Sequence, residues 1–135
     1  MIETRTHKDR GIEMALTLVD QLERQSAHQA IEGAREDFGL SYEDIADVLD
    51  VDRRTLYRYR KEMNTPSKEV RNQLDTLRHI SHLLDMIFVN REDGLSWLYT
   101  PVPLLQGRRP IDLMRKGELD EVLSVLAGDY SGAFV

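Results

Sequence analysis

Basic side chains are concentrated in one short segment of this 135-residue chain. Five cations fall within ten residues there, and Asp52 is the one acid among them. Guanidinium and ammonium groups on an exposed helix can bind DNA phosphates and base edges. The segment is therefore a candidate nucleic-acid-binding helix, and its cations are Arg53, Arg54, Arg58, Arg60 and Lys61.

The residues around this segment predict a helix-turn-helix over 41–62. Ser41 is suited to cap the first helix, and Asp44 three residues later makes an acidic variant of the capping box. Asp50 occupies the turn position that Gly commonly holds, and Asp tolerates the left-handed conformation better than most residues. Asp52 can then cap the second helix by accepting its free N–H groups.

The second helix of this motif has two different faces. Leu56 and Tyr59, three residues apart, are expected to pack inward, whereas the cations face outward as in a recognition helix. A solvated helical hairpin with a charged outer face is the alternative interpretation. The residues predicted to bind DNA are Ser41, Tyr42, Asp52, Arg53, Arg54, Thr55, Tyr57, Arg58 and Lys61.

Composition limits the possible partners. The net charge is −6 and the pI about 5.2, so the basic segment belongs to an acidic protein and DNA contact should be confined to that helix. The absence of cysteine excludes disulfides and thiolate chemistry and fits a cytoplasmic location. No apolar run approaches the roughly 20 residues of a membrane span, so no membrane association is expected.

Apolar residues recur with helical spacing along most of the chain, which predicts an all-α fold. One stripe covers residues 12–22, and another helix or its continuation covers 27–38. A long amphipathic helix is predicted to start at Pro66, and short helices follow at 95–99, 110–116 and 118–127.

We therefore divide the chain into three parts. Residues 1–65 form an N-terminal helical region with the helix-turn-helix, 66–92 a connecting or dimerisation helix, and 93–135 a small helical C-terminal module. One small module could hardly bury the stripes of the first helix and the long helix. This predicts a homodimer or a larger assembly.

The C-terminal module has a recognisable pattern. Trp97-Leu98 is followed by a Pro101–Pro103 link, then by Gly107 and by Pro110-Ile111-Asp112-Leu113, and a last helix ends near Gly128. This pattern resembles the toxin-binding domain of Xre/MbcA/ParS-type antitoxins. The chain departs from the family at Gln106-Gly107, where two glycines are usual, and at 114–117, where Thr-x-x-Gly is frequent.

The resemblance implies an antitoxin of a type II toxin–antitoxin pair. It would bind a RES-domain toxin that consumes NAD, block substrate access to the toxin's active site, and repress its own operon by binding double-stranded promoter DNA. The residues predicted for toxin binding are Trp97, Tyr99, Pro101, Pro103, Leu104, Gly107, Arg108, Arg109, Pro110, Asp129, Tyr130, Phe134 and Val135. Of these, Trp97 itself is expected to pack in the core, with the surrounding loop as the interface.

The chain's own residues leave alternatives open. Four acids and no Lys or Arg follow Gly117, so the aromatic tail could reach a basic dinucleotide pocket, or Tyr130–Val135 could be a frayed terminus. The blocking element could also be the 100–110 loop. A helix-turn-helix transcriptional regulator with a dimerisation or effector domain at its C-terminus is the alternative function.

No enzyme is expected, because no nucleophile–base set or phosphate-binding loop occurs. His79 and His82 are three residues apart, but further metal ligands are too few for a zinc site. We therefore predict neither a cofactor nor a metal.

Overall fold

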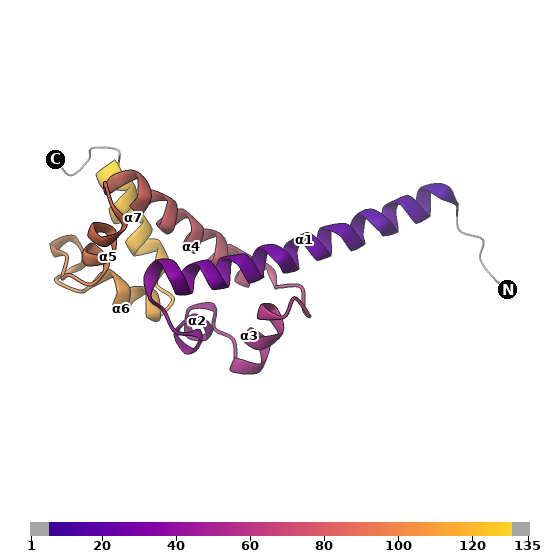
Figure 1. Cartoon of the computed structure of the whole chain (residues 1–135), viewed down its shortest axis with the longest axis horizontal. Coiled ribbons are helices and arrows are strands. Elements are labelled where there is room, and N and C mark those ends of the chain that lie inside the picture. Colours follow the sequence, from indigo (N-terminus) through magenta and orange to yellow (C-terminus); the bar gives the residue numbers. More distant parts are fainter. Residues whose placement is uncertain (1–5, 131–135) are drawn as a thin grey trace.

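The computed structural model describes residues 6–130, and almost all regular structure in that range is helical (Figure 1). The all-α expectation is confirmed. An isolated antiparallel bridge joins Val102 and Arg108. The helices are α1 (His7–Phe38), α2 (Tyr42–Leu49), α3 (Arg53–Arg60), α4 (Lys68–Ile87), α5 (Arg91–Leu98), the 3₁₀ turn η1 (Pro103–Leu105), α6 (Pro110–Arg115) and α7 (Leu119–Tyr130).

Side-chain caps set several helix starts. The Ser67 hydroxyl accepts the N–H of Val70 at 3.2 Å, so α4 begins at Lys68. Pro66 lies buried just before this cap, and the sequence prediction of a helix from Pro66 was therefore two residues early. Asn90 caps α5 in the same way, which starts that helix four residues before the predicted one.

The two apolar stripes before residue 39 belong to one continuous helix. Gly39, with φ of 69°, ends it in the left-handed conformation. Only the second half of α1 packs on the protein, through buried residues between Ala27 and Phe38. Every residue from Thr6 to Leu22 is exposed, and this half extends away from the other helices (Figure 1).

Helix α4 organises a single core. Five of its residues are buried at helical spacing, and α4 packs most extensively against α7 and α1. The ranges 1–65, 66–92 and 93–135 all contribute buried side chains to this cluster. Within residues 6–130, no helix combines the length and the apolar character that crossing a membrane requires.

Direct hydrogen bonds join the helix-turn-helix to the C-terminal helices. The Gln73 amide donates to the Val48 carbonyl at 3.1 Å and to the Gly117 carbonyl at 3.2 Å. Arg115 of α6 also lies 3.7 Å from the Asp44 carboxylate of α2. The DNA-binding candidate and the C-terminal module are thus held in a fixed arrangement.

Candidate DNA and protein interfaces

The helix-turn-helix has the turn that the sequence predicted. Asp50 lies in the left-handed region with φ of 54°, and its N–H donates to carbonyls in the last turn of α2. The Val51 N–H donates to the Ala46 carbonyl at 3.0 Å. These hydrogen bonds satisfy helix-end carbonyls, which allows a turn without glycine.

Asp52 is committed to capping α3. Its carboxylate accepts the backbone N–H of Thr55 at 2.7 Å. This hydrogen bond lowers the pKa of Asp52, and the positive charges of Arg58 and Arg54 lower it further. Ser41 caps α2 in the same manner, accepting the Asp44 N–H at 3.0 Å. Both side chains therefore position helices.

The C-terminal end of α3 is anchored on α1. His28 Nδ1 donates to the Arg60 carbonyl at 2.7 Å, which requires the proton on that nitrogen. The Arg60 guanidinium lies 3.5 Å from the centre of the Tyr42 ring and 3.5 Å from the Glu32 carboxylate. Tyr42 donates its hydroxyl proton to Glu32 at 2.9 Å, and Arg35 lies 4.2 Å from the same ring. This places Tyr42 and Arg60 in a structural cluster.

The remaining predicted residues form the outward face of α3. Arg53 and Arg54 are exposed, and Arg53 makes an ion pair with Glu43 of α2. Tyr57 is 52% exposed, and the Lys61 ammonium lies 5.7 Å from the centre of its ring. Thr55 and Arg58 are half-buried at the edge of this face. The face combines cations with an aromatic side chain, as a phosphate- and base-contacting surface requires.

In the C-terminal module, residues 100–109 form a tight loop. The Val102 N–H donates to the Arg108 carbonyl at 3.1 Å, and the Gly107 N–H donates to the Val102 carbonyl at 3.0 Å. Gln106 and Gly107 both have positive φ, 60° and 78°, which closes the loop. Its outer side carries exposed apolar side chains, namely Pro101, Pro103 and Leu104.

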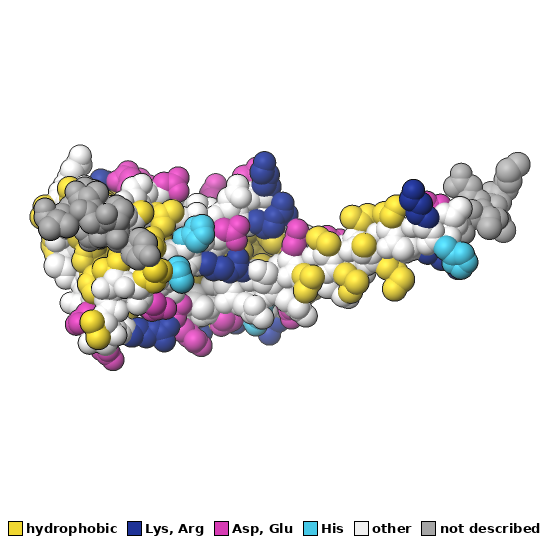
Figure 2. Space-filling model, turned by 90° about the horizontal axis from the view of Figure 1, so that it is seen from above, with side chains coloured by type: hydrophobic (Ala, Val, Ile, Leu, Met, Phe, Trp, Pro, Cys, Tyr) yellow, Lys and Arg dark blue, Asp and Glu magenta, His cyan; other side chains and the backbone are white. Residues whose placement is uncertain are grey.

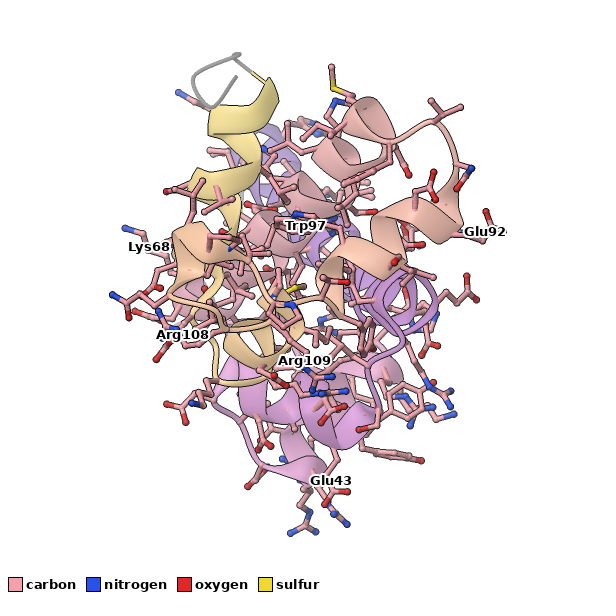
Figure 3. The ribbon with its side chains drawn as sticks, turned by 90° about the vertical axis from the view of Figure 1, so that its left-hand side faces the viewer. Glu43, Lys68, Glu92, Trp97, Arg108 and Arg109 are labelled. Carbon is pink, nitrogen blue, oxygen red and sulfur yellow. The ribbon has the colours of Figure 1, made fainter. Side chains whose placement is uncertain are left out.

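Two arginines flank this loop, and each is paired with acids. Arg108 donates to Glu121 at 3.1 Å and lies 3.9 Å from Glu118. Arg109 makes two parallel bonds with Asp112 at 2.8 and 2.9 Å, which lower the pKa of the Asp112 carboxyl. Figure 3 shows Arg108 and Arg109 below Trp97 on one end of the molecule. An open cavity of about 520 Å³ lies beside them, over α6.

Other predicted residues of this module have structural contacts. Trp97 is half-buried, with its ring centre 6.4 Å from that of Phe88. The Tyr99 hydroxyl donates to the Phe38 carbonyl at 2.9 Å, tying α5 to the end of α1. Pro110 is buried at the first position of α6, a place where its missing N–H costs nothing.

The predicted tail residues are only partly covered by the structure. Asp129 and Tyr130 fall in the last turn of α7, and their side chains are not described. Phe134 and Val135 lie outside the described residues. Among residues 6–130, no three His, Asp or Glu side chains are grouped so that they could hold a metal ion.

Sequence reasoning missed the residues that orient α3 and join it to the C-terminal helices. His28 and Glu32 lie one turn apart on α1, and Gln73 lies on α4. Their partners are 10 to 44 residues away along the chain. The helical spacing of His28 and Glu32 was the one signal available, and it does not identify a partner.

Comparison with known proteins identifies both the helix-turn-helix region and the C-terminal module. Residues 83–132 match the family model described as the antitoxin Xre/MbcA/ParS C-terminal toxin-binding domain, and residues 20–69 match a homeodomain-like domain. The mycobacterial cidal antitoxin MbcA of Mycobacterium tuberculosis is 30% identical over 105 residues, which are 78% of this chain and 92% of that protein. The chain belongs to the Xre/MbcA/ParS antitoxin family.

Two further similarities support this membership. The probable mycobacterial cidal antitoxin Rv3188 of Mycobacterium tuberculosis is 32% identical over 122 residues, 90% of this chain and 100% of that protein. A chain in the crystal structure of the M. tuberculosis MbcT–MbcA toxin–antitoxin complex has a TM-score of 0.56 and 30% identity. That match covers 80% of this antitoxin and 96% of the other chain. The predicted antitoxin identity is therefore confirmed.

Proposed function

We propose that this antitoxin binds a RES-domain toxin that consumes NAD and blocks substrate access to its active site. The observation that carries the proposal is the likeness to a chain of the MbcT–MbcA toxin–antitoxin complex, at 30% identity over 80% of this chain. The toxin-binding domain match covers α5, α6 and α7. The toxin would therefore dock on the C-terminal module.

The surface of this module suits such docking. Exposed Pro101, Pro103 and Leu104 supply apolar area on a loop whose conformation is fixed by hydrogen bonds. Arg108 and Arg109 supply polar groups at one edge of it. An apolar centre with a polar rim is the usual composition of a protein interface.

The blocking element follows from the chemistry of the toxin's substrate. A pocket for a dinucleotide offers cations to its phosphates, so an acidic segment with aromatic residues would fit it. Glu118 and Glu121 pair with Arg108. The end of α7 and the residues after it combine an acid with the aromatic residues Tyr130 and Phe134, and this is the segment that would reach the pocket.

The antitoxin would also bind promoter DNA of its own operon through α3. The homeodomain-like match over 20–69 and the cationic outer face of α3 support this function. Arg54 is exposed at the N-terminal end of α3, where a recognition helix meets base edges. Operators for such helices are usually paired half-sites, which requires two copies of α3.

Neutralisation is tested by measuring NAD consumption by the cognate toxin. Full-length antitoxin should abolish it, whereas a chain lacking residues 130–135 should still bind the toxin but permit NAD loss. Equal inhibition by both chains would move the blocking role to the 100–110 loop, and Leu104→Glu would then relieve inhibition. A cognate toxin that leaves NAD intact would refute the proposed toxin class.

DNA binding is tested on the region upstream of the gene. Arg54→Ala should weaken binding by about 1–3 kcal/mol if a bidentate base contact is lost, and the salt dependence should decrease with each lost phosphate contact. Arg91→Ala is the matched control, because Arg91 is exposed on α5 and pairs with Asp37. Unchanged affinity in a folded Arg53→Ala, Arg54→Ala, Arg58→Ala variant would remove α3 as the binding helix.

A further inference from the structure

The N-terminal half of α1 carries an apolar surface that the described chain does not cover. Its six large hydrophobic side chains are each 48–67% exposed. Together they expose roughly 600 Å², which is at the upper end of patches on monomeric proteins and marks an interaction site. Figure 2 shows them along the helix, outside the folded body. They are Ile12, Met14, Leu16, Leu18, Val19 and Leu22.

We propose that this arm, defined as residues 7–22, pairs with the arm of a second copy of the chain. The two arms would run antiparallel, with a two-fold axis at Ala15. This pairing concerns the N-terminal arm alone and does not depend on the identity of the toxin. It would supply the two α3 helices that paired half-sites require.

The sequence of the arm fits this geometry. Residues in a two-helix seam recur at alternating steps of three and four. The arm shows this spacing in Gly11 or Ile12, Ala15, Leu18 or Val19, and Leu22. A two-fold axis at Ala15 brings together residues whose numbers add up to 30. Ile12 then faces Leu18, Gly11 faces Val19, and Ala15 faces its own counterpart. The seam maps onto itself, as a symmetric interface requires.

Gly11 supports a close approach of another helix. Glycine inside an exposed helix lowers helix stability relative to alanine, so its presence calls for a packing reason. A Cβ at Gly11 would meet nothing within 4 Å. The described chain therefore gives no such reason, whereas the proposed register places the branched side chain of the partner's Val19 over the glycine.

A groove at the base of the arm continues the seam. It has a volume of about 440 Å³ between α1 and α4, and Val19, Leu22, Pro66 and Leu74 are among its lining residues. Val19 and Leu22 thus belong to both surfaces. In the proposed register the partner's Lys8 lies beside Leu22 at the mouth of this groove, where its ammonium group can approach the carboxylate of Glu23.

The size and chemistry of the surface favour a second copy over other occupants. Met14 and Leu16 lie outside the seam, so two arms would remove on the order of 800 Å² of apolar surface from water, and contacts at the two grooves add to this area. A DNA-binding surface needs cations, whereas this seam is apolar. A toxin or a lipid surface would not require a seam that pairs with itself about Ala15. A second copy of the chain is therefore the occupant of this surface.

Disulfide trapping tests the register, because the chain contains no cysteine of its own. Under mild oxidation with oxidised glutathione, Ala15→Cys should form a covalent dimer. Ile12→Cys and Leu18→Cys should cross-link efficiently only when the two proteins are mixed. Thr17→Cys, on the opposite side of the same arm, is the control and should remain at least about tenfold slower than Ala15→Cys. Efficient self-linking of Ile12→Cys would indicate parallel arms and overturn the proposal, as would equal rates for Thr17→Cys.

Sedimentation analysis of the full chain tests the interface without cross-links. The unmodified protein should be dimeric at micromolar concentration, and Leu18→Glu should raise the dimer dissociation constant at least about 100-fold. Thr17→Glu adds the same charge on the polar side and should change it by less than about threefold. Leu18 is 56% exposed on the arm, so the thermal midpoint of the folded body should be retained in both variants. A monomeric unmodified protein, or a dimer that withstands Leu18→Glu, would overturn the proposal.

Discussion

Replacing Gly117 by alanine should destabilise the protein by about 2–3 kcal/mol, through two separable effects. Gly117 has φ of +79°, and an L-residue with a Cβ pays about 1–2 kcal/mol there. The new Cβ would also lie 3.2 Å from the Val48 carbonyl oxygen, so that α2 must shift by a few tenths of an ångström. The same oxygen accepts the Gln73 amide at 3.1 Å, and loss of that hydrogen bond costs about 0.5–1.5 kcal/mol.

Gly107 offers a matched control for the first effect. Its φ is +78°, but a Cβ there would meet nothing within 4 Å. Gly107→Ala should therefore show only the backbone strain, about 1–2 kcal/mol. The difference between the two variants, about 1 kcal/mol, measures the contact between the helix-turn-helix and the C-terminal helices.

Equilibrium unfolding in urea measures both variants. Fluorescence of Trp97, the single tryptophan, reports on the C-terminal module, and far-UV circular dichroism reports on all helices. Because the core is continuous, both probes should give one coincident transition in the unmodified protein. If Gly117→Ala is no more destabilising than Gly107→Ala, the contact with Val48 contributes nothing. The account of a joined core would then be refuted.

Three other predictions concern the two surfaces. The lowered pKa of Asp52 gives a stabilising contribution that is complete above its unfolded value near 4 and is lost as pH falls through the folded pKa. Asp52→Asn should therefore flatten the acid-unfolding curve below about pH 4, and an unchanged curve would contradict the cap. Tyr42→Phe removes the hydrogen bond to Glu32 and should cost about 1 kcal/mol of stability while DNA affinity changes less than about threefold; a large loss of affinity in the folded variant would make Tyr42 a DNA contact. Leu104→Glu should weaken toxin binding by about 1–3 kcal/mol, measured by calorimetry, with the thermal midpoint unchanged because Leu104 is 54% exposed.

Local features of the fold could be predicted from the sequence because their causes lie within a few residues. Ser41 and Asp52 each accept a backbone N–H three residues further along the chain. Asp50 adopts the left-handed conformation expected from its place between two helices. The pattern from Trp97 to Gly128 also identified the antitoxin family, which the comparisons confirmed.

The tertiary structure decided which parts of these elements are buried and which remain exposed. Ile12 and Ile31 belong to similar apolar stripes of α1, yet Ile31 is fully buried and Ile12 is 51% exposed, because α4 and the short helices pack only against the second half of that helix. The sequence predicts that Tyr42 faces outward, but Arg60 of α3 and Glu32 of α1 contact its side chain. Periodicity determines a face relative to its own helix axis, whereas burial depends on partners brought together by the whole chain.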